Sequence, residues 1–371
     1  MYLGPRRRPR SSPARILVYL VLIAVFVFLI IKRPALPFVS KPGPTPTPEK
    51  TAVEYLAEAE DSYQSGAIDD AISAYLKAAE RDPKNPAPLI QAARLLTLRR
   101  KLDQALKTAQ QAVNLAPDSA LALATLGRVY DWKGQYDQAM ETCLKASRLG
   151  PSVPEAHAYL AEVYADRGFW KQAEDEANQA LDLDDSNADA WRNYGYVLES
   201  QGDYTAALDS YRRAIELRPT LSYLYLDAAR NLRALGDYNE AIVQLEKAVG
   251  LDSGNAEAYD QLGWTYFYMQ DYDRAVSEFM SAVQADPEFG SAHAHLGVTY
   301  YVLRNYEGAI DSLQKAVELG AQNEEIFYEI GLSYAYLDQC DRAREWLQRA
   351  LTLNPYSQPA LEGLRMCPEK K

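Results

Sequence analysis

The chain has 371 residues with 51 acidic and 39 basic side chains, so its net charge at pH 7 is −12. The charge is unevenly divided, because residues 1–50 carry nine lysines or arginines and a single acid. The remaining residues are therefore strongly acidic, which excludes nucleic acid as a partner, since its phosphates require a basic surface.

The first 31 residues combine a basic tail with an apolar run. Residues 1–15 contain five arginines, and Ile16–Ile31 has no polar side chain except Tyr19. A helix of this length spans ~24 Å, slightly less than a ~30 Å hydrocarbon core, and flanking Arg15 and Lys32 can reach the interfaces. The run predicts an uncleaved transmembrane helix over residues 16–31. A cleaved signal peptide is the alternative, but no small-x-small site follows directly.

The basic flanks also predict an orientation. Five arginines precede the apolar run and three basic residues follow it before residue 42. The positive-inside rule then keeps the N-terminal tail in the cytoplasm and places the rest of the chain outside it. Residues 32–50 contain six prolines. This composition predicts either a semi-rigid polyproline II spacer or a plain disordered tether.

A period of 34 residues governs the chain from residue 51 to residue 357. The unit beginning at Ala256 has apolar residues at helical spacing over two short segments, separated by the polar pair Gln270-Asp271. Units start near residues 52, 86, 120, 154, 188, 222, 256, 290 and 324. The positions of Gly263, Ala275 and Ala282 hold glycine or alanine in all nine units. Self-similarity at this period predicts a solenoid of helix pairs.

This pattern resembles the tetratricopeptide repeat (TPR) family, whose 34-residue unit is a helix-turn-helix with small residues at these three positions. The resemblance implies an all-α fold, a right-handed superhelix of nine repeats whose first helices line a concave groove. It also implies that the groove holds a protein or peptide partner.

Positions two, five, nine, twelve and thirteen of each unit face the groove in that family. Carried over to this sequence, they give a candidate protein-binding groove in which several acids, such as Asp131 and Glu162, are interspersed. The candidate residues are Arg94, Arg128, Trp132, Arg192, Tyr196, Tyr223, Arg230, Arg233, Trp264, Phe267, Tyr268, Tyr301, Tyr328 and Tyr336. Position nine has no asparagine, so the clamp that some TPR domains use for a C-terminal carboxylate is not expected. The alternative for the tyrosines is that they only seal neighbouring repeats.

Residues 358–371 begin with a half-repeat that predicts a capping helix followed by a short tail. Cys367 lies near the end of this helix, and Cys340 lies at the turn of the last full unit. A Cys340–Cys367 disulfide and two separate thiols both remain open, because the sequence does not fix the distance between them.

The sequence contains no constellation that predicts catalysis. His157 and His293 occupy one repeat position that elsewhere holds leucine or aromatic residues, which predicts packing. No phosphate-binding glycine loop, zinc-type cysteine pairing or nucleophile elbow is present, so we expect no enzyme, no cofactor and no metal site. The sequence thus predicts a membrane-anchored scaffold that binds a protein or peptide segment outside the cytoplasm. A self-oligomerising spacer and, last, an accessory subunit of an envelope enzyme complex are the alternatives.

Overall fold

A computed structural model describes residues 12–32 and 50–368, which fall into two compact units, residues 1–49 and residues 50–371. Residues 1–11 of the predicted basic tail and residues 33–49 of the predicted proline-rich linker lie outside the described residues. Each unit is therefore described by itself.

The first unit contains one described helix, α1 (Pro13–Ile31), which coincides with the apolar run. The side chains described from Leu17 to Leu29 are exposed. Among the residues that the structure describes, no helix combines the length and hydropathy that crossing a membrane requires. The predicted transmembrane helix over residues 16–31 is therefore not confirmed.

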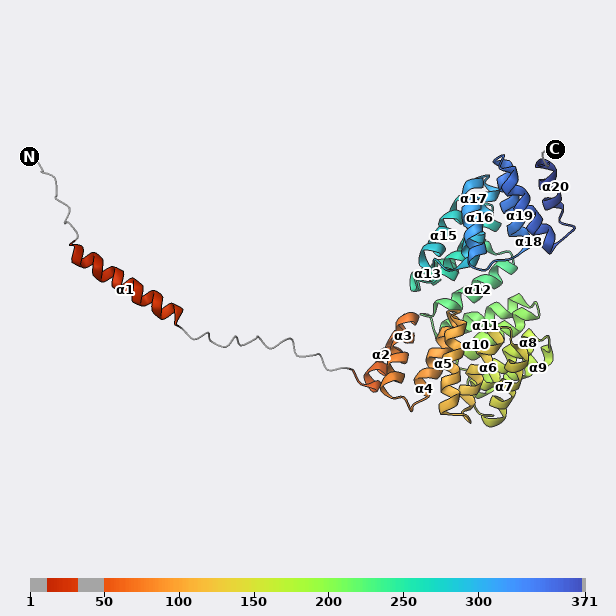
Figure 1. Cartoon of the computed structure of the whole chain (residues 1–371). Coiled ribbons are helices and arrows are strands. Elements are labelled where there is room, and N and C mark those ends of the chain that lie inside the picture. The colour runs from red at the N-terminus through yellow and green to blue at the C-terminus, as the bar shows by residue number, and fades with distance from the viewer. Residues whose placement is uncertain (1–11, 33–49, 369–371) are drawn as a thin grey trace, which may run out of the picture. The chain divides into compact units, whose positions relative to one another are not determined.

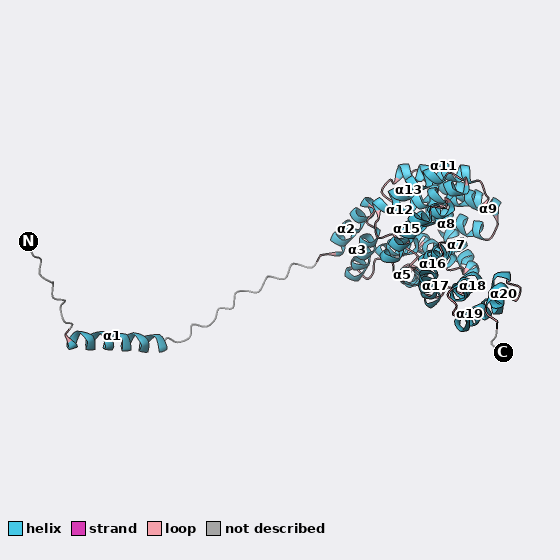
Figure 2. Cartoon of the chain, turned by 90° about the horizontal axis from the view of Figure 1, so that it is seen from above, coloured by secondary structure: helices cyan, strands magenta, loops and turns pink. Residues whose placement is uncertain are grey.

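The second unit is an all-helical stack, so the predicted α-solenoid of helix-turn-helix units is confirmed. Figure 1 shows its helices following one another in chain order, and Figure 2 shows helices and loops but no strand in the described residues. The helices are α2 (Ala52–Ser65), α3 (Ile68–Arg81), α4 (Ala87–Leu98), α5 (Leu102–Leu115), α6 (Ala120–Trp132), α7 (Tyr136–Leu149), α8 (Pro154–Asp166), α9 (Trp170–Leu183), α10 (Ala188–Ser200), α11 (Tyr204–Leu217), α12 (Ser222–Ala234), α13 (Tyr238–Leu251), α14 (Ala256–Tyr268), α15 (Tyr272–Ala285), α16 (Gly290–Val302), α17 (Tyr306–Glu318), α18 (Glu324–Tyr336), α19 (Cys340–Leu353) and α20 (Gln358–Met366).

The two helices of a repeat approach closely because a small residue on one faces a large residue on the other. A Cβ placed on Gly263 of α14 would lie 2.7 Å from ring atoms of Phe279 on α15, and one on Gly195 of α10 would lie 2.9 Å from Tyr211 on α11. Both rings are fully buried. The small positions thus make room for the side chains that fill the interior of each repeat.

The turn inside every repeat requires the left-handed backbone conformation, with a positive φ, at the fifteenth residue of the repeat. Five repeats have glycine there, whereas Arg100, Gln270, Arg304 and Asp338 adopt the same conformation with φ between 54° and 63°. Non-glycine residues in this region are strained. The next residue then caps the second helix, as where Asp271 accepts a hydrogen bond from the backbone N–H of Arg274. The polar pair that separates the two helices in the sequence therefore builds a turn.

The first repeat lies against the turn between α11 and α12, 154 residues or more further along the chain. The hydroxyl of Thr220 donates to the carbonyl of Gln64 at 2.7 Å, and Arg218 donates to the side chain of Gln64. One buried apolar cluster includes Ile68 from α3 together with Leu224 from α12. The solenoid therefore closes on itself over its first six repeats.

The last repeat ends in a covalently attached cap. Of the two alternatives that the sequence leaves open, the structure has the disulfide between Cys340 at the start of α19 and Cys367 after α20, with Cα atoms 5.1 Å apart. Ala360 and Gly363 of α20 are buried. Cys143 is the free cysteine, and it is buried.

Candidate protein-binding groove

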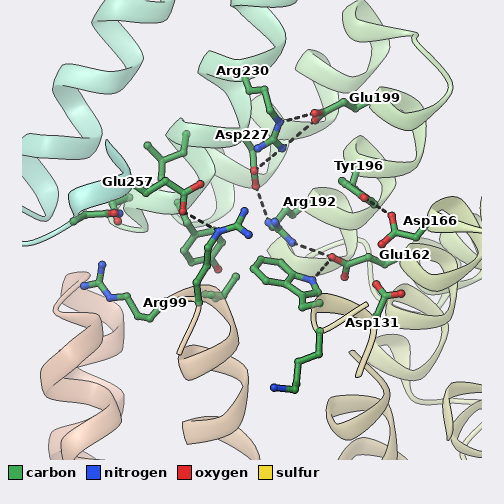
Figure 3. A pocket seen from close by; sticks show the side chains of 18 of the residues that line it. Arg99, Asp131, Glu162, Asp166, Arg192, Tyr196, Glu199, Asp227, Arg230 and Glu257 are labelled. Carbon is green, nitrogen blue, oxygen red and sulfur yellow. Dashed lines mark hydrogen bonds and ion pairs between the residues drawn. The ribbon is translucent and has the colours of Figure 1, made fainter. Parts of the chain in front are cut away.

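The closed part of the solenoid surrounds a pocket of about 500 Å³ (Figure 3). Its walls come from the ends of α4, α6 and α8, from α10 and α12, and from the start of α14. The rings of Trp132 and Tyr223 form part of the pocket wall, and most other lining side chains are charged. Five of the predicted groove residues of repeats 3–6 line this pocket, namely Trp132, Arg192, Tyr196, Tyr223 and Arg230.

Glu162 of α8 lies at the centre of one group of buried charges. Its carboxylate accepts hydrogen bonds from Nε of Arg128 at 2.9 Å and from Nε1 of Trp132 at 2.8 Å. Arg192 of α10 approaches the same carboxylate at 4.0 Å and donates to Asp227 of α12 at 2.7 Å. Because these ion pairs are buried, removing one partner would leave an uncompensated charge.

A second group joins α10 to α12. Arg230 donates to Glu199 at 2.5 Å and to Asp227 at 2.8 Å. Glu199 also accepts from the Tyr211 hydroxyl and the Asn231 amide, both at 2.8 Å. The guanidinium of Arg230 is therefore held by acids of its own chain, as Figure 3 shows.

The third group crosses the closed solenoid. Arg94 of α4 forms an ion pair with Asp189 of α10, which also accepts a hydrogen bond from the Tyr223 hydroxyl at 3.3 Å. Burial acts to raise the pKa of Asp189, but Arg94, Arg128 and Arg192 together hold that pKa below its ordinary value. Asp189 is therefore ionised at neutral pH and ties the second repeat to the fifth.

The structure supplies four of the five predicted arginines with an acid of the same chain. Arg94, Arg128, Arg192 and Arg230 all have intramolecular carboxylate partners. Two of those partners, Asp189 and Asp227, were missed from the sequence. Asp189 occupies the second position of its repeat, which is a groove position, and Asp227 occupies the sixth. Acids recurring among basic groove positions were the signal that could have found Asp189, whereas Asp227 lies outside the groove positions.

One end of the pocket contains carboxyl groups without a cation. Asp131 of α6 is 2% exposed, and a side-chain hydrogen bond links its carboxyl to that of Asp166. Asp166 of α8 accepts a hydrogen bond from the hydroxyl of Tyr196. Burial, with Glu162 and Asp166 nearby, raises the pKa of Asp131 to about 9. This carboxyl is therefore protonated at neutral pH.

A different surface lies on the first helices of the last three repeats. On α14, the ring of Trp264 contacts Phe267 at 4.9 Å and stacks on Tyr268 at 5.5 Å. Further along, Tyr336 of α18 stacks on Tyr306 at 4.7 Å, and Tyr306 lies 6.1 Å from Tyr301 of α16. We define the aromatic surface as the predicted groove residues Trp264, Phe267, Tyr268, Tyr301 and Tyr336.

The members of the aromatic surface differ in exposure. Tyr268 is 60% exposed and Tyr336 is 48% exposed, whereas Trp264, Phe267 and Tyr301 are half-buried. The stacking of Tyr336 on Tyr306 joins adjacent repeats, which agrees with the alternative that tyrosines seal neighbours. Some rings of this surface are therefore partly covered by packing, whereas the rings of Tyr268 and Tyr336 are exposed to solvent.

Two more predicted residues flank the aromatic surface. Arg233 of α12 donates to the carbonyl of Gln261 at 3.5 Å, and its Nε is buried without a hydrogen-bond partner. Tyr328 of α18 is half-buried beside Glu329, whose pKa burial and Glu325 raise to about 8. Unlike Arg230, Arg233 forms no ion pair within the described residues.

The histidines have packing partners. His157 and His293 each bond the carbonyl of the proline six residues earlier at 3.1 Å, so one repeat position performs the same local role twice. His295 contacts Asp260 at 2.6 Å and packs on Trp264. Among the described residues, no group of histidine, cysteine and acidic side chains could hold a metal ion.

Three solved structures are similar to parts of this chain. The APC/C hetero-tetramer Cut9–Hcn1 has 18% identity and a TM-score of 0.61, over 86% of this chain and 67% of that chain. YrrB, a TPR protein with an unusual peptide-binding site, has 22% identity and a TM-score of 0.43, over 51% and 97%. The C-terminal part of a TPR protein from Cytophaga hutchinsonii has 18% identity and a TM-score of 0.48, over 65% and 99%. The likeness to Cut9–Hcn1 shows the fold alone.

No curated protein matches the chain. Family models described as tetratricopeptide repeat match residues 62–126, 97–161, 159–222, 222–255, 261–324 and 324–357. Together these matches cover far more than half of the sequence and agree with the 34-residue period and the helix pairs. The chain belongs to the tetratricopeptide repeat family.

Proposed function

We propose that this chain is a non-catalytic scaffold that binds a segment of another protein on the aromatic surface of α14, α16 and α18. Tetratricopeptide repeats typically mediate protein–protein or peptide interactions, which supports a binding role. The observation that carries the proposal is the exposure of the Tyr268 and Tyr336 rings on groove-forming helices. In the first six repeats, by contrast, the predicted arginines other than Arg233 are already paired with acids of the same chain.

The chemistry of the surface defines the kind of segment it suits. Tyrosine and tryptophan rings provide large, rigid contact area and are enriched at the energetic centres of protein interfaces. Arg233 lies one repeat before Trp264 and keeps a donor that no described residue accepts. A segment with apolar side chains for the rings, and with an acidic or carbonyl group for Arg233, fits this arrangement.

Peptides selected from a displayed random library against the full chain provide the test. The double substitution Tyr268→Ala and Tyr336→Ala should weaken a selected peptide by about 2 kcal/mol, which is roughly thirty-fold in Kd. Tyr356→Ala is the matched control, because Tyr356 is 84% exposed but lies in the turn before α20. Equal binding by the double variant, with unchanged helical content, would overturn the proposal.

We also propose that residues 16–31 attach the chain to a membrane, with residues 1–15 in the cytoplasm and the repeats outside it. The proposal rests on the sequence, and the exposed apolar side chains of α1 require a partner of some kind. The Cys340–Cys367 disulfide supports it, because such bonds persist mainly in oxidising compartments. Protease added outside intact cells or spheroplasts should digest the repeats. Protected repeats would reverse the orientation.

A further inference from the structure

An unpaired positive charge lies at the α12 end of the aromatic surface. The guanidinium of Arg233 forms no ion pair within the described residues, and its only hydrogen bond there goes to the carbonyl of Gln261. Burial and then Arg230 lower the pKa of Arg233, whereas Tyr268 acts against them, so Arg233 lies near the Tyr268 hydroxyl. An arginine keeps its charge at neutral pH in any protein environment.

An acid close to Arg233 is engaged by another residue. Asp260 of α14 contacts Nδ1 of His295 at 2.6 Å, and the His295 ring packs on Trp264. Asp260 opposes the lowering of the pKa of Arg233, but burial and Arg230 have the larger effect. Because Arg233 is only half-buried, its guanidinium can bind an acidic group from outside the chain.

Carboxyl groups without a cation lie at the opposite end of the aromatic surface, on α18. Glu325 is exposed and accepts a hydrogen bond from the Tyr328 hydroxyl. Glu329, one turn further along α18, is 5% exposed, and its Oε2 has no hydrogen-bond partner within the described residues. Burial and then Glu325 raise the pKa of Glu329 to about 8, and no basic group acts against them. The negative charge at this end is therefore that of the exposed Glu325.

Tyrosine rings surround these carboxyl groups. Burial, then Tyr336, then Glu329 raise the pKa of Tyr301, so the Tyr301 hydroxyl lies near both residues. Tyr336 is exposed, and Tyr301 and Tyr328 are half-buried. The faces of aromatic rings attract cations, and a nearby carboxylate adds to that attraction. The α18 end therefore suits a basic side chain, whereas the α12 end suits an acidic one.

We propose that the aromatic surface binds an extended segment of a partner protein with an acidic side chain at Arg233, apolar side chains over the rings and a basic side chain at Glu325. This charge order rests on the proposed function and adds to it the sequence pattern of the partner. The unpaired charges of opposite sign support it, because a segment of this pattern is complementary to both ends.

The length of the segment follows from the helices between the two charges. The first helices α12, α14, α16 and α18 contact one another in that order. Three spacings of about 8–10 Å give roughly 24–30 Å across them. Arg233 is the twelfth residue of its repeat and Glu325 the second. This adds roughly 15 Å along the helices, so the diagonal is about 28–34 Å. An extended chain crosses that distance in about eight to ten residues.

Selection of a displayed library of random dodecapeptides against the full chain tests the charge order. We expect the enriched peptides to carry one acidic and one basic residue about eight to ten positions apart, in either chain direction, with apolar residues between them. Enriched apolar peptides without this pair of charges would overturn the charge order and leave the proposed function intact. If no enriched peptide is weakened by Tyr268→Ala with Tyr336→Ala, both proposals fail.

Variants of Arg233 assign the acidic end of a selected peptide. Replacing the peptide's acid by its amide should weaken binding at least tenfold to the wild type, but less than about twofold to Arg233→Met. Arg233→Glu should prefer a peptide with lysine in place of the acid. Arg213→Met, in an exposed ion pair on α11, is the control and should bind as the wild type does. Equal losses in the wild type and Arg233→Met would refute the assignment of this end.

Variants of Glu325 assign the basic end in the same way. Replacing the peptide's basic residue by norleucine should weaken binding about three- to fivefold to the wild type, but not to Glu325→Gln. Glu216→Gln on α11 is the matched control. Salt keeps the test decisive if a variant does not fold, because the wild type alone is needed. Removing both peptide charges should flatten the fall in affinity with added NaCl, and an unchanged salt dependence would contradict the charge order.

Discussion

Breaking the ion pair between Arg94 and Asp189 would show whether the solenoid closes on itself in solution. The pair joins α4 to α10 across 95 residues, and its side chains are 14% and 10% exposed. Arg94→Met removes the cation but keeps an unbranched apolar stem. Removing one partner of a buried pair costs about 3–5 kcal/mol. Because Asp189 keeps the Tyr223 hydroxyl as a donor, we expect about 3 kcal/mol.

Hydrogen exchange would locate the damage. In an open solenoid each repeat contacts only its neighbours, so the loss of amide protection would remain around α4. In the closed solenoid, protection should fall in α4 and α10 together while α18 and α19 keep theirs. Arg213→Met, at an exposed pair with Glu216, is the control and should cost less than ~0.5 kcal/mol. Unchanged protection of α10 in the Arg94 variant would refute the closure.

The pH dependence of this variant has a defined sign. The arginines hold the pKa of Asp189 below its unfolded value, against the opposing effect of burial. The resulting stabilisation is complete above about pH 4 and is lost as pH falls through the folded pKa. The difference in unfolding free energy between the wild type and Arg94→Met should therefore shrink below pH 4. A difference that grows on acidification would contradict the assigned charge of Asp189.

Three further perturbations follow from single residues. Because burial raises the pKa of Asp131 to about 9, the wild-type unfolding free energy should fall as pH rises from about pH 4 towards pH 9. Urea denaturation of Asp131→Asn at several pH values should lack this slope. Gln270→Gly should raise stability by about 0.5–1 kcal/mol, since φ of Gln270 is 63°, whereas Gln270→Ala should not. Reducing the Cys340–Cys367 bond should destabilise α20 by up to ~3 kcal/mol, measured as faster exchange of its amides, with α14 as the internal reference.

The repeat architecture could be predicted because it depends on local relations. The recurrence of small residues at the positions of Gly263 and Ala275 fixes which faces of a helix pair meet. Gly263 against Phe279 is the result in the structure. The left-handed turn residue was not predicted, because Gln270 and three other side chains replace glycine in that column.

The environment of the candidate site could not be predicted in the same way. A 34-residue period relates each repeat to the next, but it does not give the pitch that brings Arg94 to Asp189 or Gln64 to Thr220. Groove position therefore did not distinguish the buried Arg128 from the exposed Tyr268. The Cys340–Cys367 bond remained open for the same reason, since it depends on a distance between elements.

Hydroxyl-radical footprinting of the full chain with a selected peptide would test the central claim most directly, because it reports the exposure of aromatic side chains. In the proposed arrangement, the open binding surface lies on the last three repeats, and the first six repeats are closed. The peptide should protect Tyr268 and Tyr336 and leave Tyr356 and Tyr136, which are also exposed, unchanged. Protection of Tyr136, beside the pocket of the closed repeats, without protection of Tyr268 and Tyr336, would contradict it.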